Sequence, residues 1–409
     1  MPAKQGRSVG RRSVLQTAAF LAAGAPFVAL RAEEAPIRIG FPVPITGPYA
    51  TEAADQVRAA QVAIAEFNES GGLGGRRAEL LVRDDKLDPG EAATRAIELI
   101  EKDHVDFIVG SLSASVQLAV NTVTKQRGVL YNSISQSDQI VNAPDWGPTT
   151  FHEAMTPHMT AGAVGRYAFG KFGKRCAYVA ADYAYGHEMV AGFRAVGAEI
   201  GAEELAEINM PIGTRDFSTV MPRLQALRPD IVFLCNFGRD QQIFVKQAEE
   251  SGLKRMTHLV APVLLQTARI AGGAQAFAGV LGGTSYYWGI EREVASAKAF
   301  NDRFRKTYDG RLPSDYGALG YSGVRAVLAA AVKAGSTETA KVAAALAGMK
   351  YDFYKGPQFY RACDHQSVQS VFIIESKANG SVPEDVFTVL ATVPGREDML
   401  KTCAQEGLG

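Results

Sequence analysis

The feature that most constrains this chain is a regular alternation of short apolar runs and amphipathic segments, which occurs in two successive series from about residue 36. In the first series the apolar runs are IRIGFPVP, RAELLVRDD, VDFIVG and VLYN; in the second they are RCAYVAA, IVFLCNF and HLVAPV. The segments between them carry apolar residues at helical spacing. Alternating strands and helices predict a parallel sheet with helices on both faces. Two such series predict an α/β fold with two doubly wound parallel-sheet lobes.

Length and charge agree with two lobes and limit the partners. A chain of 409 residues has the length of two domains, since a domain usually holds about 100–200 residues. Acidic and basic residues balance, and no long basic run is present, so no nucleic acid partner is expected. Three helical patterns between residues 296 and 349 precede a late strand, SVQSVFIIES, which suggests that the chain returns to its earlier lobes.

The N-terminus is typical of an export signal over residues 1–32. A basic stretch, MPAKQGRSVGRRSVLQ, precedes the apolar run from Ala18 to Leu30. That run is shorter than the roughly 20 residues of a membrane-spanning helix. Arg11 and Arg12 resemble the twin-arginine signal, and an ordinary secretory signal is the alternative. We therefore expect the twin-arginine or general export machinery as a partner, and a mature chain that is soluble in the periplasm.

Signatures of catalysis, metal binding and cofactor binding are missing from the sequence. There is no G-x-S-x-G, phosphate-binding loop, H-E-x-x-H or G-x-G-x-x-G motif, so we expect neither an enzyme nor a cofactor. Cys176 and Cys235 lie in strand-like runs and should be buried thiols. Cys363 and Cys403 lie in polar segments, where the sequence leaves open whether they form a disulfide.

Two serine-rich stretches follow predicted strands. Ser111, Ser113 and Ser115 follow VDFIVG, and Ser133, Ser135 and Ser137 follow VLYN. Ligands of open parallel sheets bind at the carboxyl ends of strands, where hydroxyls and free helix N–H groups can hold a carboxylate. A serine that merely caps the following helix is the structural alternative. The pattern leaves both interpretations open.

Aromatic residues follow the predicted strands of the second series. Tyr183 and Tyr185 follow RCAYVAA, and Phe237 follows IVFLCN. Opposite a serine-lined face they would form a binding cleft with a polar floor and an apolar lid. Each of them taken alone is more often explained by packing than by ligand contact.

Several motifs, in this order, resemble one protein family: IRIGFPVPITGPYA, AIAEFNESGGLGGRRAELLVRDDKLDPGEA, VDFIVGSLSAS, DYAYGHE and DFSTVMPRLQALRPDIVFLCNFG. They are similar to periplasmic solute-binding proteins of ABC importers, in the branched-chain amino-acid branch of leucine/isoleucine/valine-binding proteins. The resemblance runs from about residue 36 to about residue 378. It implies two lobes joined by three hinge crossings, closure around a small-molecule ligand, and a membrane permease as partner of a monomeric protein.

The resemblance also implies boundaries. The first lobe is expected at 36–153 with 285–356, the second at 154–284 with 357–380, and a C-terminal tail at 381–409. The crossings are expected near Phe151 to Met155, Gly282 to Tyr286 and Tyr354 to Tyr360.

Carried over residue by residue, the resemblance names a ligand site. The carboxylate-binding loop falls on Ser113, Ala114 and Ser115, and the next ligand loop falls on Ser133 to Ser135. The remaining positions are Tyr185 and Phe237 in the second lobe, and Tyr49 to Glu52 at the mouth.

One departure from the family bears on the ligand. Leucine-type binders pair the ligand ammonium with an acidic residue of the second lobe, and here that position falls on or near Val263, in LVAPVLLQ. A buried ammonium without a counter-charge is costly, so an α-amino acid is disfavoured unless Glu52 or Asp182 substitutes. We therefore expect a carboxylate- or amide-bearing ligand with an aromatic or aliphatic body.

Three alternatives remain open from the sequence. The first is amino-acid transport by a branched-chain or other amino-acid binding protein. The second is a ligand-sensing subunit of a signalling system. The third is an exported hydrolase that uses one of the serines, which would need a histidine positioned as a base.

Overall fold

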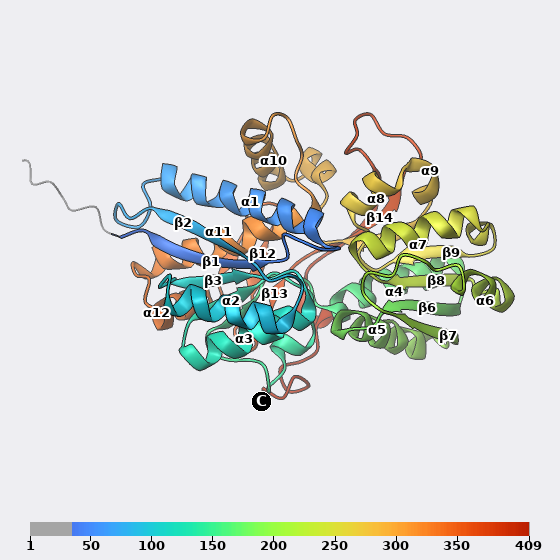
Figure 1. Ribbon diagram of the computed structural model, residues 1–409, viewed down its shortest axis with the longest axis horizontal. Coiled ribbons are helices and arrows are strands. Elements are labelled where there is room, and N and C mark those ends of the chain that lie inside the picture. Colours follow the sequence, from blue (N-terminus) through green and yellow to red (C-terminus); the bar gives the residue numbers. More distant parts are fainter. Residues whose placement is uncertain (1–34, 409) are drawn as a thin grey trace, which may run out of the picture. The chain divides into compact units, whose positions relative to one another are not determined.

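Two sheets organise the part of the chain that the computed structural model describes, residues 35–408 (Figure 1). The export signal expected at residues 1–32 lies outside the described residues. The first sheet is parallel throughout, with spatial order 2-1-3-4-5. Its strands are β1 (Ile37–Val43), β2 (Ala78–Asp84), β3 (Phe107–Gly110), β4 (Leu130–Ser133) and β5 (Thr150–His152).

Helices cover both faces of this sheet because its strands present apolar side chains on both sides. Ile108 and Tyr131 pack under α2 (Pro89–Glu101) and α3 (Ala114–Arg127). Phe107 and Val109 face the opposite core, which contains α1 (Ala50–Glu69) and a group of helices from much later in the chain. Those helices are α10 (Ala295–Thr307), α11 (Asp315–Ala334) and α12 (Thr339–Leu346). The sheet and these helices form the first lobe.

The return of the chain to the first lobe depends on close packing of α11 against α1. A Cβ atom at Gly320 would lie 2.3 Å from the backbone oxygen of Gln56. Any larger residue at this position would therefore push the two helices apart.

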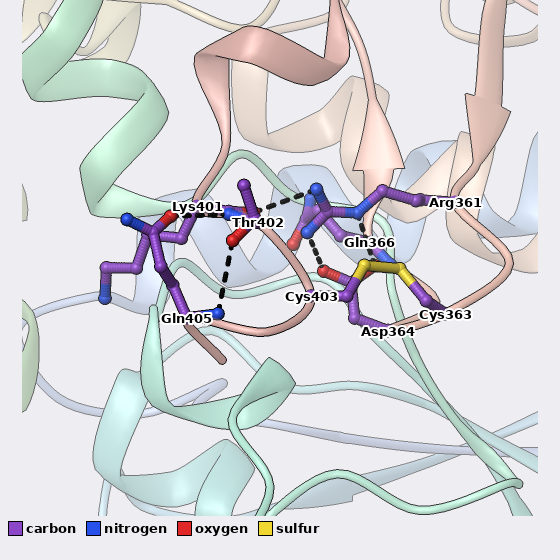
Figure 2. Close-up of a disulfide and its surroundings, with 8 residues drawn as sticks. All are labelled: Arg361, Cys363, Asp364, Gln366, Lys401, Thr402, Cys403 and Gln405. Atoms are coloured by element: carbon purple, nitrogen blue, oxygen red, sulfur yellow. Dashed lines mark hydrogen bonds and ion pairs between the residues drawn. A yellow bond between two sulfur atoms is a disulfide. The ribbon is translucent and has the colours of Figure 1, made fainter. Parts of the chain in front are cut away.

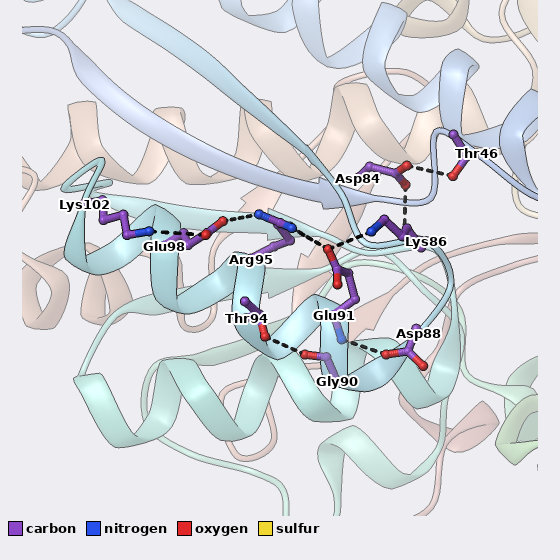
Figure 3. A network of polar contacts seen from close by, with 10 residues as sticks. All are labelled: Thr46, Asp84, Lys86, Asp88, Gly90, Glu91, Thr94, Arg95, Glu98 and Lys102. Atoms are coloured by element: carbon purple, nitrogen blue, oxygen red, sulfur yellow. Dashed lines mark hydrogen bonds and ion pairs between the residues drawn. The ribbon is translucent and has the colours of Figure 1, made fainter.

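Polar contacts run along α2, on the other side of the first lobe (Figure 3). The Asp88 carboxylate accepts a hydrogen bond of 2.7 Å from the Glu91 N–H, and Pro89 begins the helix. This is the expected N-terminal pairing of a capping side chain with a proline. Along the exposed face, Arg95 contacts both Glu91 and Glu98. Such pairs contribute only about 0.2–0.5 kcal/mol each, so the buried alanines of α2 determine its position.

The second sheet has seven strands in the spatial order β15-β14-β10-β9-β8-β6-β7. Its parallel strands are β6 (Arg175–Ala181), β7 (Glu203–Met210), β8 (Ile231–Cys235), β9 (His258–Ala261) and β10 (Leu281–Thr284). The antiparallel strands β14 (Val371–Ser376) and β15 (Phe387–Val393) extend its edge.

The helices of the second lobe are α4 (Pro157–Phe172), α5 (Ala184–Ile200), α6 (Val220–Leu227), α7 (Gly238–Glu250), α8 (Gln266–Gly272) and α9 (Ala274–Phe277). Short 3-10 turns complete the chain at Gln139–Val141, Leu253–Arg255, Trp288–Arg292 and Glu397–Met399. The predicted fold class, two doubly wound α/β lobes, is thereby confirmed.

The C-terminal region differs from the expected boundaries. Residues 350–368 form a small antiparallel sheet of β11 (Lys350–Tyr351), β12 (Gln358–Tyr360) and β13 (Ser367–Val368). Gln366 bridges to His152 at the edge of the first sheet, so the chain enters the second sheet only at Val371, beyond the expected crossing near 354–360. Residues 381–409, expected as a tail, contain β15, whose backbone pairs with β14.

A buried polar network holds the connecting segments between the lobes together. Glu153, directly after β5, accepts hydrogen bonds from the hydroxyls of Tyr351 (2.5 Å) and Tyr360 (2.6 Å). The Lys355 ammonium donates to the Ser285 carbonyl at 2.9 Å and attracts Glu153 electrostatically. Burial lowers the pKa of Lys355 to about 7. The residue after β5, the residue after β10 and the small sheet at 350–368 are thus linked through the Glu153–Lys355 pair and its hydrogen bonds.

Cys363 and Cys403 form a disulfide, which answers the question that the sequence left open (Figure 2). It joins the segment after β12 to the C-terminal residues, and Arg361 beside it donates to the Lys401 carbonyl at 2.9 Å. Cys176 and Cys235 are free and buried, as predicted. Across residues 35–408, no helix has both the length and the apolar character that crossing a membrane requires.

Candidate functional site

The strand order identifies the same place in both sheets as a candidate binding site. In each sheet the first strand lies between the second and the third, so the order reverses between β1 and β3, and again between β6 and β8. Ligands of doubly wound sheets bind at such switch points, outside the carboxyl ends of the strands. Four helices, α1, α3, α5 and α7, follow these strands in the chain. Their N-terminal N–H groups lack helical acceptors and create a positive potential.

The serine loop begins where β3 ends. Ser113 occupies the N-cap position of α3, with the extended backbone that a cap requires, yet its side chain makes no capping hydrogen bond. Ala114 begins the helix, and Ser115 is half-buried in its first turn. The sequence left open whether the serine caps the helix or contacts a ligand. At Ser113 the backbone takes the N-cap position of α3, but the hydroxyl does not bond to the helix and could contact a ligand.

The second serine loop follows β4. The Ser133 hydroxyl donates to the Gln117 side chain, so it is used within the lobe. Ser135 is buried, and its carbonyl oxygen lies 2.5 Å from Nε2 of His152. His152 thus holds the backbone of Ser135 in this second loop. The Ser133 hydroxyl is bound to Gln117 of α3, the helix that begins at the first serine loop.

Aromatic side chains from both lobes meet where the lobes are in contact. Tyr49 of the first lobe and Phe237 of the second have ring centroids 4.8 Å apart, and Phe237 is equally close to Tyr316 of α11. Tyr185 lies 6.2 Å from Phe237, and the Tyr49 and Tyr183 hydroxyls are 3.3 Å apart. We call these five residues the aromatic cluster. It provides an apolar wall with hydroxyl groups at its margin.

Close approach of the lobes at this cluster requires a glycine. Gly238, the first residue of α7, has a φ of +57°, and a Cβ there would lie 2.8 Å from the Tyr49 ring. A side chain at Gly238 would therefore separate the two lobes next to Phe237.

Two buried polar groups at the strand ends have no partner among the described residues. The Tyr185 hydroxyl is buried without a hydrogen bond, and burial raises its pKa well above the usual value for tyrosine. Both polar atoms of the Asn236 side chain, directly after β8, are also without a partner. Buried polar groups are nearly always hydrogen-bonded in folded proteins. These two side chains are therefore candidates for contact with a ligand.

Val263 is buried in the loop after β9, where its carbonyl accepts a hydrogen bond of 2.8 Å from Gln241. Its side chain supplies no charge. Of the two acidic residues that could substitute, Asp182 is more than half exposed and pairs with His187 at 3.0 Å. Glu52 is buried and accepts a hydrogen bond of 2.5 Å from Thr267 of the other lobe.

A second carboxylate crosses between the lobes in the opposite direction. Glu188 of α5 accepts hydrogen bonds of 3.0 Å from the Ser137 hydroxyl and from the Asp138 N–H. Burial raises the pKa of Glu188 to about 7. The described conformation is therefore one in which the lobes are in contact on either side of the aromatic cluster.

Reasoning from the sequence missed several of these residues. Tyr316 follows Ser314, which caps α11 through a hydrogen bond to the Gly317 N–H. An aromatic residue before a glycine at a helix start occurs in both DYG and AYG, so this local likeness could have identified it. Asn236 and Glu188 carried no comparable signal, because their position depends on how the two lobes meet.

These features define a class: two-lobed proteins that hold a small ligand between their sheets. The chain belongs to the periplasmic binding protein family, whose sequence model matches residues 36–381. It is 26% identical over 318 residues to a Leu/Ile/Val-binding protein homolog of Brucella abortus, which covers 76% of this chain and 82% of the relative. The predicted family is thereby confirmed, and it is a family of binding proteins rather than enzymes.

Solved structures agree with this assignment. A periplasmic binding protein from Burkholderia mallei superposes with a TM-score of 0.83 at 28% identity, covering 91% of this chain and 97% of that one. A solute-binding protein of an ABC transporter from Rhodopseudomonas palustris, in complex with 3,4-dihydroxybenzoic acid, superposes with a TM-score of 0.79 at 23% identity. The latter covers 88% of this chain and 97% of its own, and at that identity it shows the shared fold.

Proposed function

We propose that this chain is an exported binding protein that captures a small carboxylate- or amide-bearing ligand between its lobes and delivers it to the permease of an ABC importer. The ligand has an aromatic or aliphatic body and is released chemically unchanged. The observation that carries this proposal is the serine loop, in which the hydroxyl of a helix-capping residue, Ser113, is not used by the helix. A hydroxyl beside free N–H groups at a helix start suits a carboxylate.

The aromatic cluster supports the second half of the proposal. Its rings come from both lobes, and between the lobes they would enclose a flat or branched apolar body. The Rhodopseudomonas palustris protein supports it further, since the same fold there holds an aromatic acid. Val263, which leaves the second lobe without a counter-charge for an ammonium group, favours such acids over leucine.

Isothermal titration calorimetry of the purified protein tests the proposal. The panel consists of benzoate, para-hydroxybenzoate, phenylpropanoate and leucine, with benzyl alcohol as the matched compound that lacks a carboxylate. We expect at least one aromatic acid to bind in the micromolar range or tighter, and benzyl alcohol to give no heat of binding. Tight binding of leucine together with no response to any aromatic acid would contradict the proposed ligand class.

Two variants assign the binding to the proposed site. Ser113→Ala should weaken the tightest acid by about 2- to 10-fold, because it removes one hydrogen bond to a charged group. Ser70→Ala is the matched serine control, because Ser70 lies at the C-terminal end of α1, where its hydroxyl donates to the Phe67 carbonyl at 2.7 Å. Equal effects of the two substitutions would argue against a direct role of Ser113.

A further inference from the structure

The last described residues of the chain run from the second lobe back to the first. After β15, the edge strand of the second sheet, residues 394–408 form a segment that we call the C-terminal strap. A Cβ atom at Gly395 would lie 2.4 Å from the backbone carbonyl carbon of Gln369. The strap therefore passes directly against the segment through which the chain enters β14.

The first half of the strap packs on the second lobe. Its 3-10 turn ends at Met399, and the next residue, Leu400, belongs to a small buried cluster. The other buried members of this cluster are Met159 of α4 and Val368 of β13, and Met399 packs against them. This apolar contact fixes the strap to α4.

The second half of the strap is bonded to the segment between β12 and β13 (Figure 2). The buried Arg361 guanidinium donates a hydrogen bond of 2.9 Å to the Lys401 carbonyl, and the disulfide joins Cys403 to Cys363. Two residues separate Leu400, which packs on α4, from the disulfide. Fully extended, the chain from Leu400 to Cys403 spans at most about 11 Å. The strap thus has little slack.

The segment that carries Cys363 is fixed to the first lobe. The His365 carbonyl accepts a hydrogen bond of 3.1 Å from the N–H of His152 in β5. Beyond the disulfide, the Glu406 carbonyl accepts a hydrogen bond of 2.8 Å from the N–H of Ala143, which lies between β4 and β5. The disulfide therefore joins a segment of the first lobe to one that arrives from the second.

We infer that the disulfide between Cys363 and Cys403 completes a fourth connection between the lobes, and that this connection restricts how far they open. Within residues 35–408 the chain itself passes between the lobes three times: after β5, after β10 and before β14. Opening moves the second sheet and α4 relative to the first lobe. Because the strap is packed on α4 and tied to the first lobe two residues later, this motion either stays small or breaks contacts of the strap. The strap therefore favours the arrangement in which the lobes are in contact.

Pulsed electron paramagnetic resonance between two spin labels measures the separation of the lobes directly. An interlobe cavity of about 160 Å³ is lined by Gly47 of the first lobe and Ala271 of the second. Ile45 and Ile270 lie beside these residues and are exposed, so cysteines at the two positions accept labels without disturbing the core. The two free native cysteines are buried and do not compete for the label. The labels are linked through thioethers, which a reductant does not remove.

The decisive comparison is made on the ligand-free protein. Adding Cys363→Ser and Cys403→Ser to the labelled chain should shift the distance distribution to longer and broader values, because the lobes then open further. Reduction of the folded, labelled protein with dithiothreitol breaks the same bond without a substitution and should give the same shift. This second measurement decides the question if the double serine variant does not fold. An unchanged distribution would overturn the inference.

A matched pair of leucine variants tests the contact between the strap and α4 while the disulfide is kept. Leu400→Ala weakens the buried cluster and should shift the distribution in the same direction by a smaller amount. Leu390→Ala is the control, because Leu390 is exposed on β15. Equal shifts in the two variants would show that the contact of the strap with α4 does not restrict opening.

A consequence for binding rests on the proposed function. The dissociation constant rises as the fraction of ligand-free protein in the binding-competent arrangement falls. The double serine variant should therefore bind the tightest acid of the calorimetric panel about 2- to 10-fold more weakly. If no acid of the panel binds, the proposed function is wrong, and the distance measurement still decides the role of the strap. If acids bind both proteins with equal affinity, the strap does not favour closure and this inference is wrong.

Discussion

The Tyr185 hydroxyl offers the sharpest test of the binding site, because removing it should have opposite effects on the free and the ligand-bound protein. The side chain is 2% exposed, and its hydroxyl makes no hydrogen bond within the described residues. A buried hydroxyl without a partner costs about 1–3 kcal/mol relative to one that is satisfied. Tyr185→Phe should therefore raise the free energy of unfolding of the ligand-free protein by about 1 kcal/mol.

Ligand binding should respond in the other direction. If the hydroxyl donates a hydrogen bond to the ligand, its loss costs about 0.5–1.5 kcal/mol of binding free energy. This corresponds to an affinity about 2- to 12-fold weaker. Urea unfolding monitors the first effect, and calorimetric titration with the tightest acid of the panel monitors the second.

Tyr178→Phe is the matched control in the same lobe. The Tyr178 hydroxyl contacts the Cys176 thiol at 3.4 Å within the core of the second lobe, away from the aromatic cluster. Its removal should leave the ligand affinity unchanged. A Tyr185→Phe protein that is less stable in the absence of ligand, or that binds ligand as tightly as the unmodified protein, would refute the reasoning.

Three further predictions concern the hinge, the disulfide and closure. Glu153→Gln should lower the unfolding free energy in urea by about 3–5 kcal/mol, because it leaves Lys355 buried without a counter-charge, and Lys355→Met in the same chain should restore part of the loss. Reduction of the disulfide between Cys363 and Cys403 should lower the free energy of unfolding by about 2–5 kcal/mol, which a lower thermal midpoint would show. The same reductant should not change the thermal midpoint of a variant in which both cysteines are replaced by serine. Burial raises the pKa of Glu188 to about 7 where the lobes are in contact; if opening exposes this carboxyl group, closure takes up a proton and ligand affinity should increase as the pH falls from about 7. Glu188→Gln should reduce this pH dependence in calorimetry, and an unchanged slope would show that other groups cause it.

The elements that the sequence predicted well are those with a strong apolar period. Helices such as α1 and α7 carry it clearly, as do the strands β1 to β4, β6, β8, β9 and β14, whereas β5, β7, β10 and β15 were not predicted. In contrast, α4 was not predicted, because Gly162, Gly165 and Gly170 weaken its helical propensity. Its helical form depends on packing, since a Cβ at Gly165 would lie 3.0 Å from the Phe193 ring. Contacts between distant segments override local preference there.

The C-terminal region was harder to predict for a related reason. The strands β11, β12 and β13 are two or three residues long, which is too short for an alternating pattern to be recognised. β15 alternates as an edge strand should, but nothing local indicates that its partner is β14. Pairing between segments distant in sequence is set by the assembled sheet.

At the candidate site, the sequence could indicate positions but not the use of individual atoms. It placed Ser113 and Ser133 equally in ligand loops, whereas only the structure shows that the Ser133 hydroxyl is bound to Gln117. Glu52 and Asp182 were equivalent substitutes for the missing counter-charge at Val263. They differ in burial, and burial arises from the meeting of two lobes whose residues lie far apart in sequence.

The most direct test of the central claim is a crystal structure of the protein with the tightest-binding acid from the calorimetric panel. We predict that the ligand carboxylate lies within hydrogen-bonding distance of the Ser113 hydroxyl and the first N–H groups of α3. Its body should contact Tyr185 and Phe237. A ligand bound outside the space between the lobes, or one whose carboxylate points away from the serine loop, would contradict the account.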